Sequence, residues 1–228
     1  IVMTAMTSGL TSSVYQQYRG GTFVVSQDKD APEGAIESAE KALLATSGVT
    51  AIKHMAQWPA DAQTDATRAR LYVSPLAPKP FAEPVLSAGT APTAYDQIII
   101  PESTASSLSL KVGDTLKVRS GFTEGDYRTL TIVGTTRSNT ISMGIPASYV
   151  TDGGFSAIFG STASGKFIVA TSGANTDSNE NPPEATQDEW VAKANSALSD
   201  ISGVSVTSVR EAITKDLDQA RLGASVTT

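Results

Sequence analysis

The chain has 228 residues, of which 40% are hydrophobic and 18% are charged, with a formal net charge of −6 and no cysteine. This length and composition favour an ordered protein of one large or two small domains over a disordered chain. The acidic balance argues against a nucleic-acid partner, which requires a basic surplus or stripe, and the lack of cysteine excludes disulfide bonds and thiolate metal sites.

The sequence shows neither a membrane-spanning segment nor a signal peptide. No apolar stretch reaches the roughly 18 residues that a spanning helix requires. The start, Ile1-Val2-Met3, lacks the basic region and the unbroken apolar region of a signal peptide. We therefore expect any targeting or anchoring segment to lie outside these 228 residues.

The first predicted element is a helix over residues 1–19. Apolar residues recur there at helical spacing, at Ile1, Ala5, Met6, Leu10, Val14 and Tyr18. Residues 209–222, near the other end of the chain, show the same recurrence. Two helical ends that flank a globular body are typical of stalks, although packing of both helices against the body explains the pattern equally well.

A strand-helix-strand block follows the first helix. The run Phe23-Val24-Val25 is typical of a strand that is buried on both faces. Pro32-Glu33 predicts the start of a helix, because Pro suits the first turn and Glu interacts favourably with the helix dipole. Gly48 is placed to end this helix, and residues 49–55 are predicted as the next strand.

Residues 76–163 are predicted to form an inserted, mostly-β subdomain. The Pro-rich stretch 75–84 marks its beginning. Residues 97–100 are predicted as an apolar strand, followed by a short helix. Residues 111–119 and 128–136 are predicted as the two arms of a hairpin, because apolar and polar residues alternate along them.

A second block repeats the pattern of the first. The motif A-L-x-x-x-S-G-V-[ST] occurs at residues 42–50 and again at 197–205. The motif G-x-F-[VI]-V occurs at residues 21–25 and again at 165–169. The shared order of strand, helix and strand indicates an internal repeat.

The helix of the second block has its own predicted ends. Thr186 is a candidate N-cap, and Glu189 lies three residues later, as in a capping box. Gly203 is placed to end the helix before a strand at residues 204–209.

Two β-α-β units side by side predict an α+β fold with a ferredoxin-like, porter-type subdomain. The run Leu71-Tyr72-Val73 is predicted to add a further strand to it. This organisation assigns residues 1–75 and 164–228 to the porter-like subdomain with its terminal stalk helices, and residues 76–163 to the insert.

Two stretches approach known ligand-binding loops without matching them. Residues 160–166, GSTASGK, are followed by Phe167 where a phosphate-binding loop needs Ser or Thr, and by a predicted strand where it needs a helix. The spacing of calcium ligands is found in Asn175, Asp177, Asn179 and Asn181. Glu180 stands where a calcium loop needs Gly, and Thr186 where it needs Glu. Both stretches are better interpreted as linkers or solvated loops.

His54 is the only histidine, and we expect it at a solvent or interface edge of a strand. A hydrolase triad also needs an activated nucleophile, and the sequence has no G-x-S-x-G elbow. Trp58 and Trp190 are interpreted as packing residues. Four carboxylates lie in predicted loops without acid–base pairing: Asp61, Asp65, Glu124 and Asp126. No catalytic, cofactor-binding or metal-binding residue is therefore predicted, and the chain is not expected to be an enzyme.

The order of these segments resembles the extracytoplasmic core domain of MacB/FtsX-like ABC transporter permeases. The resemblance rests on the split repeat and on motifs within the insert: Gly89 to Pro92, QIIIPES at 97–103, LSLKVGDTLKV at 108–118 and LTIVGTT at 130–136. Thr90 departs from the family, which often has Arg after the Gly. The matching motifs are structural, so the resemblance carries over no catalytic or cofactor-binding residue.

The resemblance implies a domain on the extracytoplasmic side of the cell membrane, either extracellular or periplasmic. The full protein would have one transmembrane helix before Ile1 and three after Thr228. Two permease copies would work with a cytoplasmic ATPase subunit, and this domain would transmit the ATPase-driven change for export or extraction of a substrate. The alternative left open is a stand-alone secreted module that binds peptide or carbohydrate.

Overall fold

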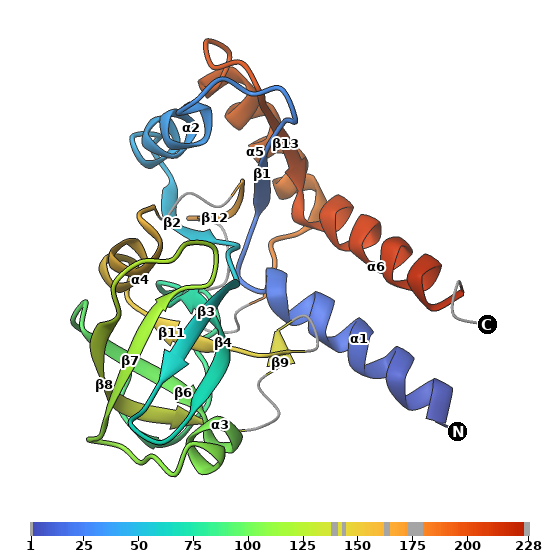
Figure 1. Cartoon of the computed structure of the whole chain (residues 1–228). Coiled ribbons are helices and arrows are strands. Elements are labelled where there is room, and N and C mark those ends of the chain that lie inside the picture. The colour runs from blue at the N-terminus through green and yellow to red at the C-terminus, as the bar shows by residue number, and fades with distance from the viewer. Residues whose placement is uncertain (1, 138–140, 143–144, 162–164, 173–179, 226–228) are drawn as a thin grey trace. The chain divides into compact units, whose positions relative to one another are not determined.

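The computed structural model describes residues 2–137, 141–142, 145–161, 165–172 and 180–225 (Figure 1). The chain divides into two compact units, each built from segments that are distant in the sequence. The α/β unit comprises Ile1–Met55, Ala77–Ala82 and Ala163–Thr228, and the barrel unit comprises Ala56–Leu76 and Glu83–Thr162.

The first boundary differs from the predicted one, because residues 56–76 belong to the barrel unit. Strand β3 (Trp58–Gln63) pairs with β7 (Thr115–Ser120), and β4 (Arg68–Pro75) pairs with β11 (Ser148–Val150). The expectation that Leu71-Tyr72-Val73 joins the porter-like sheet is therefore wrong. The pairing partners of these strands lie far along the chain, where no local pattern can indicate them.

The second boundary also differs, because a short segment of the predicted insert belongs to the α/β unit. Residues Ala77–Ala82 lie there. Phe81 is only 2% exposed and packs in a core cluster of that unit. Within the Pro-rich stretch the chain therefore returns to the α/β unit, where Phe81 is buried in the core.

The sheet of the α/β unit has the ferredoxin-like strand order. Its strands are β1 (Phe23–Gln27), β2 (Val49–His54), β12 (Lys166–Thr171) and β13 (Val204–Ser208). They lie in the order β13-β1-β12-β2, and all neighbouring pairs are antiparallel. Strands β1 and β2 are consequently parallel with β12 between them. This confirms the two predicted β-α-β units.

Helices α2 (Ala35–Leu44) and α5 (Glu184–Ala197) pack on one face of this sheet. The Trp190 ring stacks on Phe23 with 6.3 Å between the ring centroids. Gly203 follows α5 with a φ of 84°, and a Cβ at this position would lie 2.6 Å from the Cα of Ala31. Only glycine fits this left-handed turn, as the repeat motif indicates.

The starts of both helices differ from the predictions. Helix α2 begins at Ala35 after Gly34, three residues later than Pro32 suggests. Helix α5 begins at Glu184 after Pro183, so Thr186 lies within the helix and is not its N-cap. The adjacent prolines decide the second case, because Pro183 already has the extended backbone of an N-cap residue, with φ −53° and ψ 152°.

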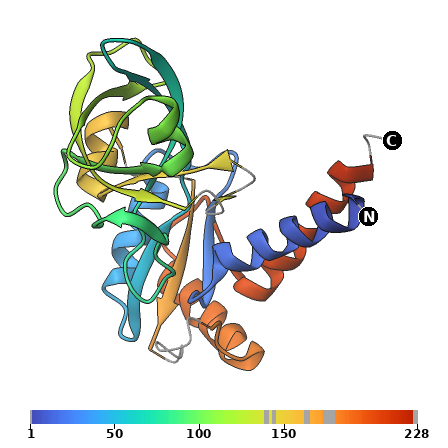
Figure 2. The same ribbon diagram turned by 90° about the horizontal axis from the view of Figure 1, so that it is seen from below.

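The terminal segments form helices α1 (Val2–Tyr18) and α6 (Val209–Ser225), as predicted. Figures 1 and 2 show the two helices side by side, with their free ends together. The sheet-proximal ends pack on the face opposite α2 and α5. Buried residues in this second core include Tyr18, Val24, Phe81, Ile168, Val209 and Ile213. Each helix therefore packs on the body at one end and extends beyond it as a stalk at the other.

The barrel unit is a closed sheet, with two short helices among its described residues. Its strands lie in the order β5-β8-β6-β11-β4-β3-β7, and β7 also pairs with β8. The remaining elements are β5 (Leu86–Gly89), β6 (Gln97–Pro101), α3 (Glu102–Ser107), β8 (Arg128–Thr136), β9 (Ile141–Ser142), β10 (Ile145–Pro146) and α4 (Asp152–Phe159). The antiparallel β7–β8 pair confirms the predicted hairpin.

Candidate functional site

The candidate site is the junction where the two terminal helices join the sheet of the α/β unit. Tyr18, the last residue of α1, is fully buried. Its hydroxyl donates a hydrogen bond of 2.5 Å to Oδ2 of Asp216 on α6 and accepts one of 2.7 Å from Nζ of Lys166 on β12. One phenol group thus connects both stalk helices with a central strand. We call Tyr18, Asp216 and Lys166 the junction triad.

The environment keeps the Tyr18 hydroxyl in its neutral, donating form. Burial raises the pKa of Tyr18 well above its usual value, and the hydrogen bond to Asp216 and the charge of that carboxylate raise it further. Burial lowers the pKa of Lys166, the Asp216 carboxylate opposes that effect, and the nearby Lys215 adds to it. The triad is therefore a hydrogen-bonded link between partly desolvated groups.

The C-terminal end of α1 is held by two further side chains. Nζ of Lys53 on β2 donates to the carbonyl of Gln17 at 2.9 Å. Nδ2 of Asn181 donates to the carbonyls of Tyr18 at 2.7 Å and Gly21 at 2.8 Å. The bonds to Gln17 and Tyr18 go to carbonyl groups in the last turn of α1, the bond to Gly21 fixes the chain just after the helix, and a cation suits the negative end of the helix dipole. Burial lowers the pKa of Lys53 to about 8.

The N-terminal end of α6 is capped by side chains of neighbouring elements. Oε1 of Gln187, a buried residue of α5, accepts from the N–H of Arg210 at 2.9 Å. Oγ of Ser208 accepts from the N–H of Glu211 at 3.1 Å. Because capping groups bind N–H groups that a helix leaves free, α6 starts at a fixed place on the body.

The candidate residues from the phosphate-loop pattern have other roles. Gly160 ends α4, whereas residues 162–164 lie outside the described part of the chain. Lys166 opens strand β12 and belongs to the junction triad. No local pattern indicates this role, because Tyr18 is 148 positions away from Lys166.

Of the calcium-type residues, Asn175, Asp177 and Asn179 lie outside the described residues. Asn181 is described, and its amide donates hydrogen bonds to the carbonyls of Tyr18 and Gly21 at the end of α1. Across the described residues, no group of three or more His, Asp or Glu side chains is placed to hold a metal ion.

His54 lies on β2, which is an edge strand of the sheet as expected. Its side chain, however, is only 8% exposed, and its Nε2 lies 3.0 Å from Oε1 of Glu40 on α2. The imidazole also contacts the edge of the Phe167 ring, with 6.2 Å between the centroids. The residue joins a helix to the sheet, in contrast to the solvent or interface position that the sequence suggested.

None of the helices in the described part of the chain combines the length and the apolarity that a membrane span requires.

No family model matches the sequence, and no curated protein shows a significant match to it. Solved structures with a similar fold include the following two crystal structures. The extracellular domain of the noncanonic ABC-type transporter YknZ from Gram-positive bacteria aligns with a TM-score of 0.55 and 16% identity, over 81% of this chain and 98% of that one. The periplasmic region of MacB from Actinobacillus actinomycetemcomitans aligns with a TM-score of 0.57 and 12% identity, over 90% and 97%. The chain therefore has the fold of these extracytoplasmic transporter domains, as the sequence resemblance predicted.

Proposed function

We propose that this chain is the extracytoplasmic domain of an ABC transporter permease and that it transmits ATPase-driven movement across the membrane. The fold supports the first part, because the chain aligns with 98% and 97% of two such domains. The junction triad carries the second part. It connects each stalk helix to the sheet through a buried hydroxyl group.

A transmitting domain needs stalks that move together with the body. The free ends of α1 and α6 lie together (Figures 1 and 2), so both helices can continue into one membrane surface. At the other end, α1 is tied to α6 by Tyr18–Asp216, to β12 by Lys166 and to β2 by Lys53. Hydrogen bonds to charged groups contribute roughly 1.5–3 kcal/mol each to stability. Sliding one helix past the other would break several of these bonds at once. A displacement of the stalks is therefore passed to the sheet.

The partners follow from this role. The stalks would connect to transmembrane helices of the permease, and a cytoplasmic ATPase subunit would drive them. A second permease copy would complete the transporter. The domain itself would lie on the extracellular or periplasmic side of the cell membrane, and its part in export or extraction would be mechanical, with no catalytic residue.

The test uses the full-length permease with its ATPase in lipid nanodiscs. The 228 residues contain no cysteine, so a spin label can be attached at a Cys residue introduced at Asp126, in the barrel unit, in each of the two permease copies. We expect ATP to change the distance distribution between the two labels. Tyr18→Phe should reduce this change while ATP hydrolysis continues.

Tyr15→Phe is the matched control, because Tyr15 lies on the same helix and is 50% exposed. It should leave the ATP-dependent change intact. A distance between the two permease copies that does not change when ATP is added to the unaltered permease would refute transmission. A gene that encodes a cleavable signal before Ile1 and a stop codon soon after Thr228 would refute the permease assignment and favour a secreted binding module.

A further inference from the structure

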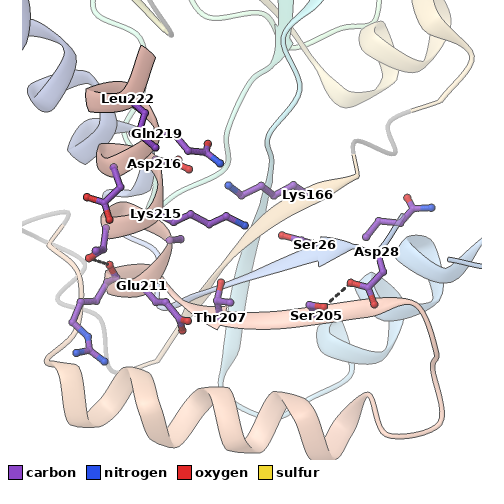
Figure 3. Close-up of a pocket in the computed structure, with 15 residues that line it drawn as sticks. Ser26, Asp28, Lys166, Ser205, Thr207, Glu211, Lys215, Asp216, Gln219 and Leu222 are labelled. Atoms are coloured by element: carbon purple, nitrogen blue, oxygen red, sulfur yellow. Dashed lines mark hydrogen bonds between the residues drawn. The ribbon is translucent and has the colours of Figure 1, made fainter. Parts of the chain in front are cut away.

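A groove of about 960 Å³ lies within the α/β unit, between α6 and the sheet. Strands β1, β12 and β13 form its floor, and α6 forms its wall (Figure 3). Its volume suits a small molecule better than a single ion. Lys166 and Asp216 of the junction triad belong to its lining, and the groove extends from them along the strands.

The floor of the groove is polar, although the same sheet face is apolar under the terminal helices. Ser26 is in register with Ser205 on one neighbouring strand and with Lys166 on the other, so the three side chains form a row. Two positions earlier on β1, Val24 is in register with Ile168, and both are fully buried. The sequence thus changes from apolar to polar on one sheet face, where the groove begins.

Two ammonium groups approach each other across the groove. Figure 3 shows Lys166 on β12 and Lys215 on α6 extending toward one another. Lys215 is exposed, and within the described ranges it forms no ion pair. Burial lowers the pKa of Lys166 most, the Asp216 carboxylate raises it, and the charge of Lys215 lowers it, so both neighbours interact with this ammonium group. An anion between the two lysines would give Lys215 a counter-charge and would add to the compensation that Asp216 already gives Lys166.

Most charged groups of the groove, Lys166 included, already have partners within the protein. The pairs are Arg210–Glu184, Asp218–Arg221, Asp28–Ser205 and Asp216–Tyr18. Four carboxylates place negative charge in the lining: Asp28, Glu211, Asp216 and Asp218. A doubly charged anion would be repelled more strongly by these carboxylates, whereas a single negative charge can be balanced by the two lysines.

We propose that this groove binds a small polar ligand through a carboxylate group held between Lys166 and Lys215. The hydroxyl groups of Ser26 and Thr207 on the floor supply further donors, and hydrogen bonds between ammonium and carboxylate groups are charge-assisted. The carboxylate can come from the C-terminus of a peptide or from a small organic acid, because the recognising chemistry is the same. This site goes beyond the transmission role, and Lys166 belongs both to it and to the junction triad.

The test is an NMR titration of the isotope-labelled 228-residue chain at constant ionic strength. The probes are N-acetylated Ala-Ser-Ala, the same tripeptide with a C-terminal amide, sodium acetate and inorganic phosphate. We expect the free-acid tripeptide or acetate to shift the backbone signals of Ser26, Lys166 and Thr207, and the amide to leave them unchanged. Binding of the tripeptide alone identifies a peptide C-terminus, and equal binding of acetate identifies a small acid.

Lys215→Gln should weaken this binding about tenfold, since one charge-assisted bond is lost. Lys215 is exposed and lies outside the junction triad, so the variant should remain folded. Lys41→Gln is the matched control, because Lys41 is an exposed lysine on α2, against the opposite face of the sheet. Any one of four results would overturn the proposal: no shifts at about 10 mM probe, equal binding of the amide, tighter binding of phosphate, or unchanged affinity in Lys215→Gln.

Discussion

Replacement of Tyr18 by Phe tests whether the junction triad stabilises the α/β unit. The substitution keeps the buried ring and removes only the hydroxyl, which bonds Asp216 at 2.5 Å and Lys166 at 2.7 Å. Each bond involves a charged group and is worth roughly 1.5–3 kcal/mol, but Asp216 is only half-buried, so water and a direct contact between the two charges can replace part of the loss. We expect the free energy of unfolding to fall by about 2 kcal/mol.

The assay is urea unfolding followed by tryptophan fluorescence. The chain has two tryptophans, Trp58 in the barrel unit and Trp190 in the α/β unit. In a Trp58→Phe background, Trp190 reports on the α/β unit alone, where it stacks on Phe23. The Tyr18→Phe variant is compared with Tyr15→Phe, whose exposed side chain should change the unfolding free energy by less than about 0.5 kcal/mol.

A double-mutant cycle with Asp216→Asn measures the coupling within the triad directly. The interaction energy between the Tyr18 and Asp216 substitutions should be about 1 kcal/mol or more, because the two groups share one hydrogen bond. Equal stabilities of Tyr18→Phe and Tyr15→Phe, with no coupling to Asp216, would show that the hydroxyl contributes nothing. The reasoning about the junction would then fail.

Three further predictions concern separate features. Burial lowers the pKa of Lys53 to about 8, so between pH 8 and 10 the unfolded chain binds a proton that the folded chain has released. The free energy of unfolding should therefore rise over this pH window, and it should rise less in Lys53→Met. Equal slopes of the unfolding free energy against pH for the two proteins, measured by urea unfolding, would contradict this. Gly113 has a φ of 97° with open space around it, so Gly113→Val should lower the free energy of unfolding by roughly 1–3 kcal/mol through backbone strain. The control is Gly125→Val, at an exposed loop position without positive φ, which should leave the free energy of unfolding nearly unchanged in the same assay. Gly/Ser linkers that replace residues 56–76 and 83–162 but keep 77–82 should leave an α/β unit with cooperative urea unfolding, and a gradual transition would show that the units are not separable.

The sequence by itself determined the local elements of the fold. Residues 128–136 form β8 with the predicted bounds, because alternation along a strand is a property of the segment itself. The repeated motifs located both β-α-β units, since Gly203 must adopt a positive φ wherever this turn occurs. The two terminal helices also followed from their own periodicity.

Only the tertiary structure decided which elements share a sheet and which side chains meet. The amino-acid composition of strands β3 and β4 would suit either sheet. They belong to the barrel sheet because β3 pairs with β7 and β4 pairs with β11. The bond between Tyr18 and Asp216 spans 198 positions, and in sequence Tyr18 resembles another apolar residue of a helix. Hydrogen bonds between residues so far apart leave no periodic or local signal, because their partners are chosen by the fold as a whole. The sequence therefore specified the stalks, and the folded chain specified what holds them to the sheet.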